Sequence, residues 1–153
     1  MRLLLDTTYL LPAIGISIRG LSKDAPVNLI KKGHQISISD ISIFELSAKG
    51  AKHIIAGTLP AERVTRGIRA IVHDETIETV PVHESTILHT AFDLRSLLTD
   101  FIDCLILSTA VNQCDALITE DSDIQNLKKN KEFTELLRPI NPRFKIQTLT
   151  EIT

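Results

Sequence analysis

Short apolar segments alternate with amphipathic segments along the whole chain. Segments of buried-strand character lie at Arg2–Leu5, Gln35–Ser39, Thr76–Val82, Ala116–Ile118 and Phe144–Leu149. In the segments between them, apolar residues recur every three or four positions, which predicts helices from Tyr9, over 23–33, from 41 through Ala48, and over 61–73, 84–97, 101–112 and 131–137. This alternation predicts a parallel sheet with right-handed crossovers.

Glycine, proline and small polar residues mark the expected element ends. Thr7 and Thr8 are predicted to cap the helix that starts near Tyr9, and Ser39 or Asp40 to cap the helix after the second strand. Pro81 cannot donate a ladder hydrogen bond, so it indicates a strand end or a strand at the edge of the sheet.

Composition favours one soluble α/β domain over residues 1–153. Hydrophobic residues make up 43% of the chain and aromatics only 4%, so the core must be built mainly from aliphatic side chains. We expect a cytoplasmic protein without a membrane span, because Asp6 interrupts the only apolar N-terminal run. Cys104 and Cys114 are expected to be reduced core residues and not zinc ligands.

Four acidic residues occupy the places where ligands gather in open α/β sheets. Asp6 follows the first strand and Asp121 the fourth, Glu45 lies early in the helix after the second strand, and Asp103 opens the helix before the fourth. If the first and fourth strands are neighbours, the four carboxylates converge, and they repel one another unless a cation lies between them. Hard oxygen ligands favour Mg²⁺ or Mn²⁺, so the pattern indicates metal-assisted phosphodiester hydrolysis.

Simpler interpretations exist for individual residues. Each acid alone could cap a helix or occupy a turn, and for Asp100 capping is the preferred interpretation. The net charge of −2 argues against nucleic-acid binding by overall charge, which leaves local cations as RNA-backbone candidates: Lys128, Lys129 and Lys131. With no Trp, one Tyr and five Phe, no aromatic platform for base stacking is predicted.

Three ordered motifs resemble those of PIN domains. The segment 103–123, DCLILSTAVNQCDALITEDSD, is similar to the C-terminal signature of that family, in which an acid opens an Ala-rich helix that leads to a strand and Thr-x-Asp-x-Asp. The opening LLLDTTYLL resembles the first strand of the family, and SDISIFEL resembles its second motif. Ile124 departs from the pattern, because an aromatic residue more often stands there.

The resemblance implies a three-layer α/β/α, Rossmann-like fold with a central parallel sheet of about four to five strands. It also implies that Asp6, Glu45, Asp103 and Asp121 bind the metal and carry catalysis. Asp123 would be an accessory ligand, with Thr7 and Thr119 as supporting hydroxyl groups.

The function implied is that of a Mg²⁺- or Mn²⁺-dependent ribonuclease, and at this length the toxin of a VapBC-type pair, with a homodimeric state and an antitoxin partner. Two alternatives stay open: a non-catalytic PIN-like module that binds RNA or protein, and a nuclease of RNA processing or maturation. A Toprim-type reading of Asp121-Ser122-Asp123 is weaker, because those proteins place a glutamate where this chain has Asp6.

Overall fold

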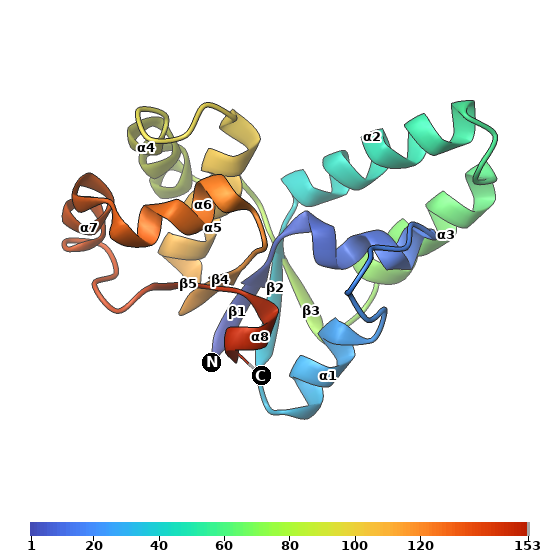
Figure 1. Ribbon diagram of the computed structural model, residues 1–153, viewed down its shortest axis with the longest axis horizontal. Helices are drawn as coiled ribbons and strands as arrows, with labels where there is room; N and C mark the ends of the chain where they lie inside the picture. The colour runs from blue at the N-terminus through green and yellow to red at the C-terminus, as the bar shows by residue number, and fades with distance from the viewer. Residues whose placement is uncertain (153) are drawn as a thin grey trace.

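The computed structural model describes residues 1–152, which form a five-stranded parallel sheet with helices on both sides (Figure 1). The strand order is β3-β2-β1-β4-β5, with every neighbouring pair parallel. The strands are β1 Arg2–Leu5, β2 Gln35–Ser39, β3 Ile77–Val80, β4 Ala116–Ile118 and β5 Lys145–Gln147. The first and fourth strands are neighbours, which is the condition under which the four carboxylates were expected to converge, and the β3 strand that precedes Pro81 lies at the edge.

Helices divide into two layers that cover opposite faces of the sheet (Figure 1). One face is covered by η1 Thr7–Ile14, α1 Ala25–Lys31, α2 Ile41–Ile55, α3 Ala61–Val72 and the short α8 Leu149–Ile152. The other face is covered by α4 Ser85–Leu94, α5 Phe101–Gln113, α6 Ser122–Asn126, η2 Leu127–Lys129 and α7 Lys131–Leu137. The three-layer arrangement predicted from the sequence is therefore confirmed.

Alternate strand residues supply the two cores. Leu3 and Leu5 of β1 pack among the side chains of η1, α2 and α3, whereas Leu4 packs with α4, α5 and α7. All three side chains are fully buried. A strand that is buried on both faces has no solvent-facing positions for polar residues. This explains why three leucines follow one another in β1 after Arg2.

The element that follows β1 differs from its prediction. A 3-10 helix starts at Thr7, and its N-cap is Asp6, whose Oδ1 accepts a hydrogen bond from the Thr7 amide at 2.7 Å. Neither Thr7 nor Thr8 is the cap. Asp40 occupies the N-cap position of α2 but forms no capping bond, because its Oδ1 accepts from the Val82 amide instead.

Two short helices, α6 and α8, were not predicted. They contain five and four residues, which is too few for an apolar period to be visible in the sequence. Both cysteines are buried free thiols, as expected. Within residues 1–152, no helix has both the length and the apolar character that a bilayer crossing requires.

Two glycines allow α2, α3 and η1 to pack closely. A Cβ atom on Gly67 of α3 would lie 2.2 Å from the carbonyl oxygen of Ala13, and one on Gly50 of α2 would lie 2.5 Å from a Val64 methyl group. Both glycines are buried. The Ala13 oxygen belongs to the backbone and cannot move aside without shifting η1. This helix begins directly after Asp6, the acid that follows β1.

We predict that Gly67→Ala destabilises the fold by about 1–3 kcal/mol, because the overpacking cost exceeds the helix-propensity gain of under about 1 kcal/mol. Thermal unfolding measured by circular dichroism tests this. Thr65→Ala, on an exposed position of the same helix, is the control and should change stability by less than about 0.5 kcal/mol. A Gly67→Ala variant as stable as the wild type would contradict the packing described.

Candidate active site

The central pair of strands brings two chain segments together at one edge of the sheet. Leu5 of β1 is in register with Ile118 of β4, so the residues that follow, Asp6 and Thr119, leave the sheet side by side. The Asp6 amide continues the ladder by donating to the Ile118 carbonyl at 3.0 Å. The site is therefore anchored in the most buried part of the fold.

Asp6 is held by two hydrogen bonds. Its Oδ2 accepts from the Thr119 hydroxyl at 2.5 Å, and its Oδ1 accepts from the Thr7 amide. Only 8% of the residue is exposed, and this burial raises the pKa of the Asp6 carboxyl, although the two hydrogen bonds oppose the rise. The Thr119 hydroxyl also accepts from the Asp121 amide at 3.1 Å, so one buried side chain links the two acids.

Glu45 reaches the same place from α2. Its Oε1 accepts a hydrogen bond from the Thr7 hydroxyl at 2.6 Å, and Ser42 Oγ lies 2.9 Å from that hydroxyl. Burial raises the pKa of the Glu45 carboxyl, and the Asp6 charge adds to the rise, against the hydrogen bond from Thr7. Thr7 therefore orients a carboxylate from another element, in addition to following the first acid.

Asp103 occupies the first turn of α5. Burial together with the charges of four neighbouring acids raises its pKa to about 7; those acids are Asp100, Asp121, Asp6 and Glu45. Asp100 is the N-cap of the same helix, with its Oδ1 accepting from the Ile102 amide at 2.9 Å. The predicted capping role of Asp100 is confirmed, and its charge also acts on the site.

Side chains from four separate segments line a pocket of about 460 Å³: Asp6, Thr7, Thr8, Glu45, Lys49, Asp100, Asp103, Glu120 and Asp121. The four acids named from the sequence are thus brought together. The other three acidic or basic residues had not been assigned to the site. Of these, Lys49 was detectable, because it follows Glu45 by one helical turn and so shares its face of α2.

Lys49 does not neutralise the pocket. Its charge lowers the pKa values of Asp6 and Glu45, but both remain raised above their ordinary values. Among the described residues, ion pairs within 4.0 Å join Arg2 to Glu78, Lys128 to Glu151 and Arg138 to Glu135, and none involves Lys49. The acids therefore keep an excess of negative charge.

The donor chemistry of the pocket fits a hard divalent cation. Within residues 1–152, no three acidic, histidine or cysteine side chains lie close enough to form a ready-made metal cage. Mg²⁺ does not need one, because it usually keeps several waters and binds through one or two carboxylates. A pocket rich in carboxylate oxygens, in which the pKa values of Asp6, Glu45 and Asp103 are raised, is consistent with such a partly hydrated ion.

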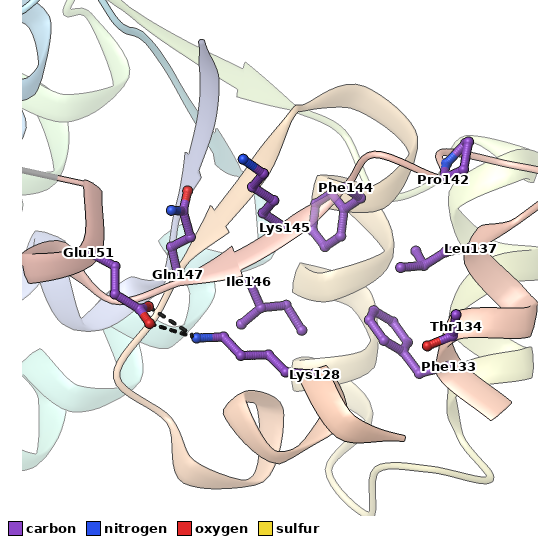
Figure 2. Close-up of a pocket in the computed structure, with 10 residues that line it drawn as sticks. All are labelled: Lys128, Phe133, Thr134, Leu137, Pro142, Phe144, Lys145, Ile146, Gln147 and Glu151. Carbon is purple, nitrogen blue, oxygen red and sulfur yellow. Dashed lines mark hydrogen bonds and ion pairs between the residues drawn. The ribbon is translucent and has the colours of Figure 1, made fainter. Parts of the chain in front are cut away.

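Other predicted site residues lie elsewhere. Asp123 is exposed and lines a different pocket, together with Asn126 and Asn130, so the structure does not bring it to the four acids. Lys128 forms an ion pair with Glu151 at 3.0 Å beside a hollow of about 500 Å³ between β5 and α7 (Figure 2). Lys129 and Lys131 are exposed and line none of these pockets.

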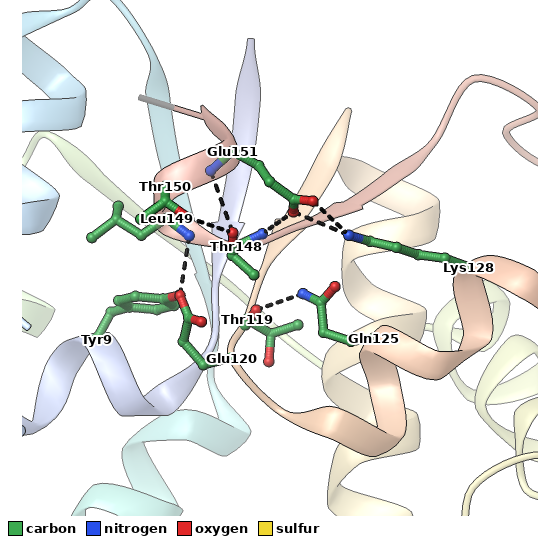
Figure 3. Close-up of polar contacts among 9 residues, drawn as sticks. All are labelled: Tyr9, Thr119, Glu120, Gln125, Lys128, Thr148, Leu149, Thr150 and Glu151. Carbon is green, nitrogen blue, oxygen red and sulfur yellow. Dashed lines mark hydrogen bonds and ion pairs between the residues drawn. The ribbon is translucent and has the colours of Figure 1, made fainter. Parts of the chain in front are cut away.

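Glu120 connects the pocket to the C-terminal segment (Figure 3). Its Oε1 accepts from the Tyr9 hydroxyl at 2.7 Å and from the Leu149 amide at 3.1 Å. Burial and the Glu120 carboxylate raise the pKa of Tyr9, so the phenol keeps its proton and stays a donor. The only feature of the sequence that could have assigned Glu120 to the site is its position between Thr119 and Asp121.

Comparison with protein families matches residues 3–130 to the PIN domain. This chain belongs to the PIN-domain family. The match spans the segments that carry Asp6, Glu45, Asp103 and Asp121, so the resemblance recognised in the three motifs is confirmed.

Solved PIN-like folds resemble this chain over nearly its full length. VapBC2 from Rickettsia felis, bound to a DNA fragment from its promoter, superposes with a TM-score of 0.62 at 17% identity, covering 97% of this chain and 98% of that one. A toxin–antitoxin complex from Klebsiella pneumoniae gives 0.53 at 20% identity, covering 84% and 92%. No curated protein matches the sequence. At these identities the likeness concerns the fold.

The raised pKa of Asp103 predicts a pH-dependent stability penalty in the metal-free PIN domain. Between about pH 4 and pH 7 the folded protein keeps a proton on Asp103 that an unfolded aspartate, with a pKa of about 3.9, has released. This group therefore favours folding most at low pH, and the benefit is lost as the pH rises through about 7. Asp103→Asn should raise the melting temperature at pH 8 in EDTA by a few degrees and leave it almost unchanged at pH 4.

The matched control is Asp93→Asn, the same isosteric change at an exposed position of α4 outside the pocket. It should give no gain that depends on pH. A lower melting temperature for Asp103→Asn at pH 8 would show that the charge of Asp103 stabilises the fold, contrary to the electrostatics described.

Proposed function

We propose that this protein is a metal-dependent endoribonuclease. The observation that carries the proposal is the convergence of four carboxylates from four separate segments on one pocket, where burial and the charges of neighbouring acids raise the pKa of Asp103 to about 7. A fold gains no stability from such crowding. The crowding of acids is explained if the pocket binds a cation and a phosphodiester substrate.

In this proposal Asp6, Glu45, Asp103 and Asp121 would hold a partly hydrated Mg²⁺ or Mn²⁺ ion, one or two of them directly and the others through its waters. When bound, the ion supplies a Lewis acid for the phosphate and an acidified water for attack. Asp6 and Glu45 are oriented for this task by the Thr119 and Thr7 hydroxyls, which donate to them. Asp123 lies outside the pocket and is left out of the proposed ligand set.

Asp103 and Lys49 have further roles. Asp103 holds a proton near neutral pH in the metal-free pocket and gives it up when positive charge enters, so metal binding should release a proton. Lys49 lines the pocket and has no ion-pair partner within 4.0 Å among residues 1–152, which supports the proposal that its ammonium group attracts a substrate phosphate.

We further propose that the protein is the toxin of a VapBC-type pair and acts as a homodimer in the cytoplasm. Membership of the PIN family and the fold likeness to two toxin–antitoxin complexes support this role. The partner would be an antitoxin that covers the acidic pocket. A nuclease of RNA maturation would use the same pocket, and the cellular experiment described below distinguishes the two.

Asp103→Asn should reduce Mn²⁺-dependent RNA cleavage at least about 100-fold, because it removes a ligand charge without changing side-chain size. Cleavage of a labelled single-stranded RNA, with and without EDTA, tests this. Asp93→Asn should retain wild-type activity. Undiminished cleavage by Asp103→Asn would refute the proposed site, and failure of the wild type to bind divalent ions in calorimetry would favour the non-catalytic module.

The toxin role predicts a growth effect. Expression of the wild-type chain should arrest growth of a bacterial host, whereas Asp103→Asn should be tolerated at equal protein levels. Co-expression with the product of the neighbouring gene should restore growth if that product is the antitoxin. Normal growth with an active wild-type enzyme would favour the RNA-maturation role.

A further inference from the structure

A pair of exposed phenyl rings includes the first residue of α5, the helix that carries Asp103, although the composition had indicated no aromatic platform. Phe92 of α4 and Phe101 of α5 stack with ring centroids 6.1 Å apart and an interplanar angle of 13°. The two residues are 57% and 37% exposed. The His89 ring meets Phe92 edge-on at 6.2 Å and continues the row along α4.

The position of the pair connects it to the proposed chemistry. Phe101 is the first residue of α5 and stands between Asp100 and Asp103, which both line the pocket. Residues two positions apart on a helix project to different sides of it, so the Phe101 ring and the Asp103 carboxylate lie around α5 from each other, roughly one helix diameter or about 10 Å apart. About three stacked nucleotides, at ~3.4 Å each, span that distance.

The size of the pair argues against a protein partner. Taking roughly 200 Å² for a whole phenylalanine side chain, the two rings together expose about 200 Å². A stable protein interface buries about 800 Å² on each partner. The exposed residues around the rings on α4 and the loop after it are polar: His89, Asp93, Arg95 and Ser96. On α4 and the loop after it, polar side chains therefore border the rings.

A nucleobase fits such a surface. The nearly parallel, partly exposed rings offer π surface on which a base can stack, and base–aromatic stacking tolerates every base. Arg95, one helical turn after Phe92, is exposed and donates through Nη1 to the Leu98 carbonyl at 3.2 Å, which leaves other guanidinium N–H groups available to a phosphate.

We propose that Phe101 and Phe92 form a stacking platform that positions single-stranded RNA beside the acidic pocket. This inference rests on the proposed function, because it names how the substrate of that site is held. Phe101 and Phe92 are positioning residues, and Asp103 retains the chemistry.

The test uses a short single-stranded RNA that carries one 2-aminopurine, whose fluorescence is quenched by stacking. In the Asp103→Asn background with Mn²⁺, Phe101→Leu should weaken binding about ten-fold and remove the quench, whereas Phe101→Tyr should keep both. With Asp103 intact, Phe101→Leu should raise KM about ten-fold and change kcat less than about two-fold. Leucine keeps the apolar packing, and circular dichroism checks the fold.

The outcomes separate this inference from the proposed function. Unchanged RNA affinity in Phe101→Leu, with cleavage still abolished by Asp103→Asn, would overturn the platform and leave the nuclease intact. RNA binding through Phe101 without any cleavage by the wild type would overturn the nuclease and keep the platform. A dimer that dissociates in Phe101→Leu, seen by size-exclusion chromatography, would assign the rings to subunit contact and overturn the platform.

Discussion

The hydrogen bond from the Thr119 hydroxyl to Asp6 ties the site to the centre of the sheet. It can form because β1 and β4 are parallel neighbours in a register that ends both strands at the same level. Parallel strands so placed require a long connection between them, which here contains β2, β3 and six helices. The pocket is thus completed only when residues more than 100 positions apart in the chain have met.

The same arrangement gathers charge that the fold does not neutralise. Salt bridges among the described residues lie outside the pocket, and Lys49 reduces the raised pKa values of Asp6 and Glu45 without restoring them. A protein selected only for stability would replace one acid by a neutral residue of similar size. The presence of all these acids is explained if cation binding stabilises the folded state by as much as their mutual repulsion destabilises it.

Sequence reasoning predicted the sheet well because the strands carry strong local signals. Gln35–Ser39 and Ala116–Ile118 match β2 and β4 at both ends, and the apolar stripe of Lys131–Leu137 matches α7. It failed where tertiary contacts decide local structure. Asp40 occupies the N-cap position of α2 without capping it, because its carboxylate accepts from the Val82 amide, and no pattern within residues 35–48 contains that information.

The candidate site was predictable to the same extent and for the same reason. Acids at strand ends can be recognised from their position in the sequence. Glu120, in contrast, is held at the pocket by hydrogen bonds from Tyr9 and Leu149, which come from opposite ends of the chain. Asp121 and Asp123 look equivalent in sequence, yet α6 starts between them. Because Asp121 is the N-cap, its side chain accepts from the Ile124 amide and stays at the strand end, while Asp123 turns with the first helical turn toward another pocket. A helix of only five residues thus separates two acids that a motif alone would treat as one ligand pair.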